Sequence, residues 1–366
     1  MGIETGSLAG GWTRLPRPQA GSLFHDGGSA SLLGRRMGRS MVWRMPTNPV
    51  PLLLPPACDP NEPALLAISG GRDSVALLHL LLEAGFEKLI LCHLNHGLRG
   101  AESEGDAKFV QRLAKKHGMP CEIEETDVAA LAQERKISIE TAAREERHAF
   151  LQRSAGENDV WVVFMAHHAE DQAETILGNV CRGTGLAGLA GMQAVQRMNS
   201  GLHLVRPLLA ARRSEIDAYL KSRRLKFRED SSNQSPLHRR NRLRHEALPL
   251  LNDICARDVV PQVLRLGALA AQDDDCLRHQ AVAFLMKAEN LNEDRSLPVT
   301  PDLLALHPAV LSRVFAVWLR EVLELPGIES AEIEAAMSLL APEGPAKVNL
   351  PQDRHLRRKA KRLWLE

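Results

Sequence analysis

Short apolar runs alternate with amphipathic segments of helical period between residues 64 and 180, and this alternation restricts the fold more than any other feature. Strands are predicted at 64–68, 88–95, 121–126 and 160–166. The segments between them place apolar residues at helical spacing, and two of them end in the turn signals Gly85 and Gly118. Strands joined by helices predict an α/β fold, a parallel sheet with helices on both faces. Ligands of such sheets bind beyond the carboxyl ends of the strands.

The chain has 366 residues, enough for more than one domain. We expect an α/β domain at 60–210, a basic connecting region at 211–250 and a smaller, mostly helical accessory domain at 251–366. Residues 1–50 are rich in Gly, Ser and Arg and show no sustained helical or strand period. Two interpretations stay open for them: an organellar transit peptide, or an untranslated or disordered extension ahead of the methionines at 37, 41 and 45.

Composition argues against several functional classes. Lys and Arg number 46 against 45 Asp and Glu, so any nucleic-acid site must come from local clustering of charge. Eight Phe, five Trp and one Tyr are few for a base-stacking platform. No apolar run approaches the roughly 18 residues of a membrane helix, which predicts no membrane partner. The six cysteines form no C-x-x-C pair, which disfavours redox, zinc-ribbon and Fe–S sites and suits a reducing cytoplasm.

The strongest motif, SGGRDS, follows the first predicted strand and precedes a helix. It consists of Ser69, Gly70, Gly71, Arg72, Asp73 and Ser74. Glycines allow a sharp turn, and the serines and free N–H groups of the following helix suit an anion such as phosphate. Asp73 would repel that anion unless it binds a metal ion, which predicts Mg²⁺ there. The alternative is an ordinary strand–helix turn; the Walker A spacing and its lysine are absent.

Polar residues also cluster where the second and fourth predicted strands end. HLNHGLRG (93–100) places His93, His96 and Arg99 in a phosphate clamp, a metal site or a polar loop, with zinc disfavoured because no carboxylate or cysteine stands at ligand spacing.

The fourth strand leads into AHHAEDQAET, which brings together His167, His168, Glu170, Asp171 and Glu174. Asp171 and Glu174 share one helical face and suit a cation or an ammonium group, although an acidic first turn alone would also explain them. The later GTGLAG follows a helix, not a strand, so it is not interpreted as a dinucleotide-binding loop.

Positive charge gathers between residues 206 and 246, which hold twelve Lys or Arg and five Asp or Glu. Within this stretch HRRNRLRH (238–245) carries the residue types that contact phosphate and ribose. We predict nucleic-acid contacts from Arg239, Arg240, Arg242 and Arg244, with Arg240 reaching the active site; a solvated basic helix is the alternative.

These motifs occur together, in the same order, in one known family. SGGRDS, HLNHGLR, AAREERHAF, AHHAEDQAET, RGTGLAGLAGM, RPLL and EDSSN followed by RRNRLRHEALP resemble the bacterial tRNA(Ile)-lysidine synthetases from about residue 64 to 250. These enzymes belong to the N-type ATP pyrophosphatase (PP-loop) superfamily. GMP synthetase, asparagine synthetase, NAD synthetase and the tRNA thiolases have the same SGGxDS loop. Glu170 stands where the family usually has Asp, and His148 where it usually has Tyr.

The resemblance implies a ligase that uses ATP and Mg²⁺ to adenylate the wobble cytidine of CAU-anticodon isoleucine tRNA and then joins free lysine. It implies an ATP site at 69–74 with His93 and Arg144, Mg²⁺ at Asp73, and lysine held by Asp171 and Glu174. The residues with catalytic roles would be Asp73, His167, Asp171 and Arg240. A tRNA thiolase and an inactive tRNA-binding relative are the alternatives, and a homodimer is left open.

Overall fold

The computed structural model describes residues 41–43, 50–55, 58–98, 100–198, 200–229, 239–287, 290–359 and 361–366. The predicted N-terminal extension therefore lies almost wholly outside the described residues. The chain divides into two compact units: the first runs mainly from residue 35 to 265, and the second mainly from 266 to 366. Among the described residues, no helix combines the length and the apolar character needed to cross a bilayer.

A six-stranded sheet forms the centre of the first unit. Its strands, in spatial order, are β5 (Cys121–Glu125), β4 (Leu89–Asn95), β3 (Ala64–Ala67), β6 (Val162–Phe164), β8 (His203–Val205) and β7 (Val195–Arg197). Five strands are parallel, and only the edge strand β7 is antiparallel. The predicted parallel sheet is confirmed, and its carboxyl ends lie at one edge. A separate two-stranded ribbon pairs β1 (Met41–Trp43) with β2 (Leu52–Leu54).

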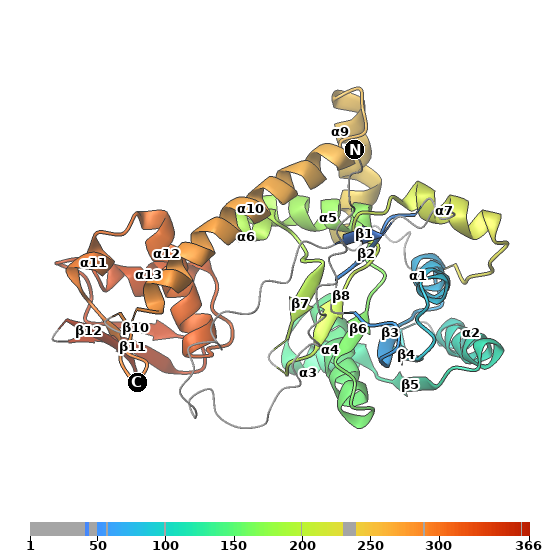
Figure 1. The fold of residues 1–366 in the computed structure, drawn as a ribbon, viewed down its shortest axis with the longest axis horizontal. Coiled ribbons are helices and arrows are strands. Elements are labelled where there is room, and N and C mark those ends of the chain that lie inside the picture. The colour runs from blue at the N-terminus through green and yellow to red at the C-terminus, as the bar shows by residue number, and fades with distance from the viewer. Residues whose placement is uncertain are drawn as a thin grey trace, which may run out of the picture. The chain divides into compact units, whose positions relative to one another are not determined.

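Helices cover both faces of this sheet, as the alternation predicts. Leu66 of β3 packs with α1 (Arg72–Glu83), α2 (Ala101–His117) and α7 (Arg213–Ser222) in one apolar cluster. The adjacent Leu65 points to the opposite face, where it packs with α4 (Ile139–Glu157). Figure 1 shows α1 and α2 on one side of the strands and α4 on the other. The short helix α3 (Val128–Arg135) packs on α4.

Two further helical segments of the first unit follow the sheet strands. Helix α5 (Ala169–Val180) begins just after β6. The chain from residue 239 continues through α8 (Arg239–Arg242), a π-helical turn η2 (Leu243–Ala247) and α9 (Leu248–Ile254). The long α10 (Val260–Leu285) starts in the first unit and ends in the second. Ala173 of α5 packs with Leu248 and Val260, so α5 supports the start of this helical segment.

The second unit combines helices with a sheet that helical periodicity did not predict. Its helices are α11 (Pro301–Leu304), α12 (Pro308–Val317), the π-helical turn η3 (Trp318–Val322) and α13 (Ser330–Ser338). Its antiparallel sheet has the order β10 (Lys347–Leu350), β11 (Arg354–Lys359), β12 (Arg362–Leu365) and β9 (Leu297–Pro298). The basic tail forms strands because Leu356 and Leu363 alternate inward into the core around Trp318.

Candidate active site

The phosphate-loop motif turns sharply between β3 and α1. Gly70 has φ +81°, and a Cβ atom there would lie 3.1 Å from Cδ1 of Phe109. The Ser69 hydroxyl accepts a hydrogen bond from the Gly71 N–H at 3.2 Å and lies 3.2 Å from the Ser74 hydroxyl. No side chain caps the start of α1, so its first-turn N–H groups stay available for a ligand. The loop therefore has the form of an anion-binding nest.

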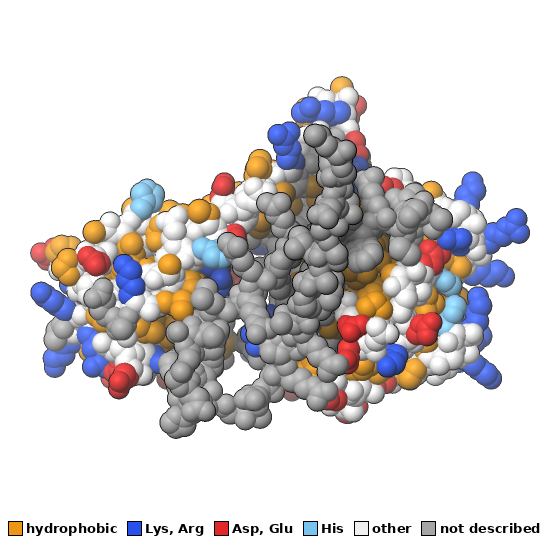
Figure 2. Space-filling model, in the orientation of Figure 1, with side chains coloured by type: hydrophobic (Ala, Val, Ile, Leu, Met, Phe, Trp, Pro, Cys, Tyr) orange, Lys and Arg blue, Asp and Glu red, His pale blue; other side chains and the backbone are white. Residues whose placement is uncertain are grey.

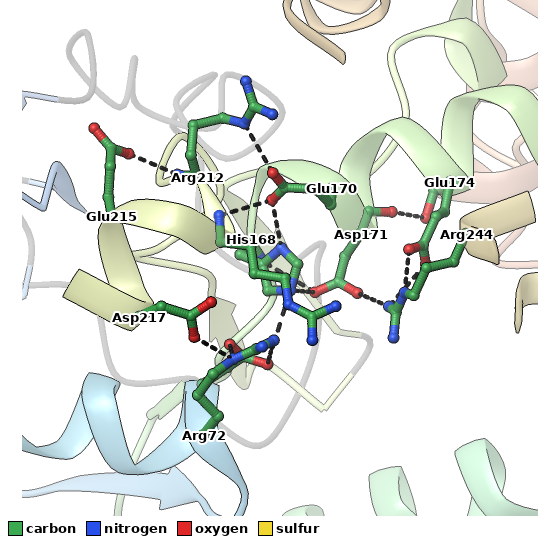
Figure 3. Close-up of polar contacts among 12 residues, drawn as sticks. Arg72, His168, Glu170, Asp171, Glu174, Arg212, Glu215, Asp217 and Arg244 are labelled. Carbon is green, nitrogen blue, oxygen red and sulfur yellow. Dashed lines mark hydrogen bonds and ion pairs between the residues drawn. The ribbon is translucent and has the colours of Figure 1, made fainter. Parts of the chain in front are cut away.

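Asp73 extends from the first turn of α1 toward the end of β6. Its Oδ1 accepts a hydrogen bond from Arg72 Nε at 2.9 Å, and its Oδ2 lies 3.7 Å from His168 Nε2. Arg72 also pairs with Asp217 at 3.3 Å, which fixes its guanidinium between α1 and α7 (Figure 3). Asp73 is thus the connection between the phosphate loop and the corner at the start of α5.

His168 organises that corner. It is the N-cap of α5, and its backbone N–H donates to Oδ2 of Asp171 at 3.0 Å. Its ring is 3% exposed, with Nδ1 3.0 Å from Glu170 and Nε2 3.5 Å from Asp171. Burial lowers the pKa of His168, but the hydrogen bond to Glu170 and the charges of Asp171 and Asp73 outweigh burial, and the pKa is raised. The ring therefore favours the charged form among three carboxylates.

Glu170 turns toward the start of α7. Its carboxylate accepts hydrogen bonds from Arg212 Nε at 2.8 Å and from the Arg213 N–H at 3.0 Å. Burial raises the pKa of Glu170, but the interactions with His168 and Arg212 have the larger combined effect and lower it from 4.5 to about 2. Arg212 also pairs with Asp258 at 2.7 Å. Sequence analysis did not single out Arg212, which is one arginine among many in a basic stretch.

Asp171 and Glu174 lie on one face of α5 and hold two arginines of the following helical segment. We call Asp171, Glu174, Arg240 and Arg244 the carboxylate–arginine cluster. Arg240 donates to Glu174 at 2.8 Å and to Asp171 at 2.9 Å, while Arg244 donates to Glu174 at 2.6 and 3.1 Å and to Asp171 at 3.1 Å. The π-helical turn η2 begins between the two arginines, a kind of irregularity that often marks functional positions.

The other predicted arginines of this segment lie apart from the carboxylates. Arg239 donates to the Gly178 carbonyl at 3.1 Å, and Arg242 is exposed and pairs with Glu246 at 2.8 Å on its own helix. The sequence prediction thus placed four arginines on tRNA, while the structure brings Arg240 and Arg244 to the carboxylates.

Arg144, Arg147 and Arg206 have no carboxylate within ion-pair distance among the residues that the structure describes. Arg206 is 4% exposed, and it bonds to Gln193 and Gln196 while its Nε has no partner. Burial and the charge of Arg144 lower its pKa to about 10. Burial, Arg240 and Arg144 also lower the pKa of Arg147. Unbalanced buried positive charge of this kind suits an anionic ligand.

Two other histidines of these motifs, His167 and His93, have different surroundings. Burial lowers the pKa of His167 more than the charge of Asp171 raises it, and Arg206, Arg240 and Arg147 lower it further, so the ring is neutral near pH 7. His93 is 6% exposed, and its Nδ1 lies 2.8 Å from the Ile68 carbonyl, directly before the phosphate loop. Arg99, named with His93 in the sequence analysis, lies outside the described residues.

His148 lies among the arginines. Burial and the charges of Arg144, Arg147 and Arg206 lower its pKa to about 4. The ring is therefore neutral near pH 7 and adds no further positive charge there.

The backbone of Arg228, which the sequence analysis did not single out, holds the phosphate loop through Gly70 and Gly71. The Arg228 N–H donates to the Gly70 carbonyl at 2.9 Å, and residues 71 and 228 form an isolated parallel bridge. The Arg228 guanidinium donates to the buried Asp106 of α2 at 2.9 Å. A Cβ atom on Gly105 would lie 2.9 Å from Arg228 Nη2, so this glycine leaves room for the ion pair.

Comparison with known families agrees with this geometry. A family model described as the PP-loop domain matches residues 52–251, more than half of the chain. The chain belongs to the PP-loop family. The PP-loop domain contains every site residue described above except Asp258. A second model, the TilS substrate binding domain, matches residues 300–364 in the second unit.

Curated relatives of this PP-loop protein carry one name. It is 47% identical over 190 residues to a tRNA(Ile)-lysidine synthase of Porphyromonas gingivalis, covering 52% of this chain and 41% of that one. It is 36% identical over 300 residues to that of Geobacter sulfurreducens, covering 80% and 63%. A U34-tRNA thiolase of Methanococcus maripaludis, solved with its [4Fe-4S] cluster, matches at TM-score 0.48 and 18% identity over 58% of this chain and 72% of that one. The chain spans 41–42% of the length of two relatives from Porphyromonas gingivalis strains.

Proposed function

We propose that this chain is an ATP-dependent ligase that adenylates the wobble cytidine of CAU-anticodon isoleucine tRNA and joins lysine to it, forming lysidine. The observation that carries the proposal is the meeting of a phosphate loop and a buried carboxylate pair at one sheet edge. His168 Nε2 lies 3.7 Å from Asp73 of the loop and 3.5 Å from Asp171 of the pair. Adenylation followed by attack of an amine requires a phosphate site and an ammonium site side by side.

The phosphates of ATP are expected at residues 69–74. Ser69, Ser74 and the first-turn N–H groups of α1 would donate to phosphate oxygens, and Gly70 and Gly71 allow the backbone to approach them. Arg144, with the unpaired charges of Arg147 and Arg206, would neutralise further phosphate charge. We propose that His93 supports the loop through Ile68.

Asp73 fits a magnesium ion shared with the phosphates. Mg²⁺ usually binds proteins through one or two carboxylates together with substrate phosphates. The described residues contain no group of three or more His, Cys, Asp or Glu that would hold a metal by themselves, so the phosphates would supply most of the ligands. Bound there, Mg²⁺ would stabilise the negative charge that develops on the departing pyrophosphate.

Lysine is expected at Asp171 and Glu174, which would hold it through an ammonium group. His167 is neutral near pH 7, and its Nδ1 has no partner among the described residues, so this nitrogen can accept a hydrogen bond from the amine. Its lowered pKa makes it a weak base on its own, and the negative charge of a bound phosphate would raise that pKa toward the range in which the ring takes up the proton that the amine must lose. The deprotonated amine then forms a bond to C2 of cytidine while the bond from C2 to the AMP oxygen breaks.

The tRNA would bind through exposed positive charge and the second unit. Exposed basic side chains lie on α2 and around the end of α7: Lys108, Arg112, Lys115, Lys116, Lys221, Arg223, Arg224 and Lys226. Figure 2 shows Lys and Arg side chains projecting along the edge where these helices lie. Arg239 and Arg242 are the proposed contacts nearest the active site. The match of residues 300–364 to a substrate binding domain supports a tRNA-binding role for the second unit.

A cytoplasmic location is proposed with this function. All six cysteines are free, as a reducing compartment would keep them.

Lysine incorporation tests the function directly. The purified chain is incubated with Mg²⁺-ATP, labelled lysine and a CAU-anticodon isoleucine tRNA transcript, and label in the tRNA is counted. The expected result is incorporation that needs ATP and is lost in Asp73→Asn and with a GAU-anticodon transcript. Folded protein that incorporates no lysine would refute the ligase. If AMP still forms with tRNA, a thiolase becomes the better assignment; if no AMP forms, an inactive binder does.

A further inference from the structure

The carboxylate pair proposed to hold lysine is already occupied by the chain's own arginines. Every carboxylate oxygen accepts a hydrogen bond: Glu174 Oε1 from Arg244, Glu174 Oε2 and Asp171 Oδ1 from both arginines, and Asp171 Oδ2 from the His168 N–H. The two positive charges balance the two negative charges. An incoming ammonium group would find no oxygen without a donor and no net negative charge on this set of four residues, so we expect one guanidinium to leave when lysine binds.

The two arginines are not equivalent in this cluster. Arg244 makes three of the five arginine hydrogen bonds, and its side chain is 21% exposed, against two bonds and 37% for Arg240. Arg244 alone supplies a donor to Oε1 of Glu174, whose side chain is fully buried. Without Arg240, every oxygen of the pair would keep one donor. Without Arg244, a buried carboxylate oxygen would have none, which is costly.

Charge gives the same assignment. Asp171 and Glu174 with Arg244 alone carry one net negative charge, which matches a single ammonium group. Arg240 also helps to lower the pKa of the half-buried Arg147, so its position combines attraction to the two carboxylates with a repulsion that leaving the cluster would relieve. A phosphate group of either substrate would offer the released guanidinium a new partner.

We propose that Arg240 is an exchangeable occupant of the lysine site and that Arg244 is its fixed positioning residue. Lysine takes the place of Arg240, while Arg244 continues to hold Glu174 and Asp171 in place. This inference rests on the proposed function, and it gives Arg244 a role other than the tRNA contact predicted from the sequence. The affinity for lysine in the absence of tRNA is then reduced by competition within the chain.

The test is lysine binding by the full chain without tRNA, measured by equilibrium dialysis with labelled lysine. Arg240→Gln should bind lysine about tenfold more tightly than the parent protein, and Arg240→Lys should fall between them. Arg244→Gln should bind more weakly than the parent, with partial rescue in Arg244→Lys. Arg153→Gln is the control, because it removes an exposed arginine that pairs with Glu124 and belongs to neither the carboxylate–arginine cluster nor the proposed tRNA contacts, and its lysine binding should equal that of the parent.

Kinetics separate positioning from a general structural role. In the tRNA-dependent reaction, Arg244→Gln should raise the KM for lysine and leave the KM for ATP unchanged. Lysine binding by Arg240→Gln that is equal to or weaker than that of the parent would overturn the exchange, as would tighter binding by Arg244→Gln. If lysine enters tRNA but Arg240→Gln shows no gain, only the exchange fails. If neither the parent nor any variant binds lysine and no lysine is incorporated into tRNA, the proposed function fails.

Discussion

Glu170→Gln tests how the corner at the start of α5 is stabilised. The substitution keeps the size of the side chain and removes its charge. In the native protein the carboxylate accepts from Arg212 at 2.8 Å and from the Arg213 N–H at 3.0 Å, and it lies 3.0 Å from His168. The side chain is only 17% exposed, so solvent screens these contacts weakly.

The pKa of Glu170 sets the upper limit of the effect. A value lowered from 4.5 to about 2 corresponds to about 3 kcal/mol, because one pKa unit is worth about 1.4 kcal/mol. Glutamine still accepts one hydrogen bond, so we expect Glu170→Gln to lower the free energy of unfolding by about 1–3 kcal/mol at pH 7. The folded pKa is the lower one, so the stabilisation is complete above pH 4.5 and is lost as the pH falls toward 2.

Urea unfolding at several pH values provides the assay. Pulsed hydrogen exchange, read on peptides from β6 and α5, follows the first unit separately. The difference between parent and Glu170→Gln should be largest near pH 7 and shrink between pH 4.5 and 2. Glu246→Gln, which removes an exposed carboxylate paired with Arg242, should leave the midpoint unchanged. Equal midpoints for Glu170→Gln and the parent at pH 7 would refute the reasoning.

Three further outcomes follow from the structure. Gly70→Ala should raise the KM for ATP about tenfold, because alanine is strained at φ +81° and its Cβ meets Phe109. Gly156→Ala, on α4 where a Cβ has open space, should leave the KM for ATP unchanged. A KM for ATP of Gly70→Ala equal to that of the parent would contradict this. Trp318→Ala should lower the free energy of unfolding of the second unit by about 3–5 kcal/mol in denaturant titrations, since the side chain is fully buried and bonds to the Arg295 carbonyl. Burial and the charges of His117 and Lys116 lower the pKa of His79 to about 4. Between pH 6.5 and 4 the unfolded chain therefore takes up a proton at His79 that the folded protein does not, and the free energy of unfolding falls as the pH falls. In His79→Gln the free energy of unfolding should fall less over that range.

The first unit could be predicted from sequence because its signals are local. Apolar runs such as 88–95 and the helical segments between them specify a parallel sheet, and a parallel sheet places all strand ends at one edge. Asp73, which follows β3, and Asp171, which follows β6, were therefore expected near each other, and the structure places both beside His168.

Long-range charge pairing could not be predicted in the same way. The stretch from 206 to 246 holds twelve basic residues, and sequence does not tell which of them turn inward. Arg212 and Arg244 pair with carboxylates 42 and 70 residues away, and only the packed fold selects them. The sheet of the second unit was hidden for a related reason, because basic residues on the outward positions of β11 obscure the alternation around Leu356.

The contact between Arg228 and α2 has a consequence for how substitutions will be tolerated. Gly105 and Asp106 belong to none of the motifs, and on sequence grounds they are two ordinary positions of a charged helix. Yet any side chain at 105 displaces the Arg228 guanidinium, and any loss of charge at 106 removes its partner, while the backbone of Arg228 bonds to the Gly70 carbonyl. A saturation mutagenesis screen selecting for ATP-dependent activity should therefore mark position 106 as intolerant, whereas small side chains at 105 require only a movement of the flexible Arg228 guanidinium.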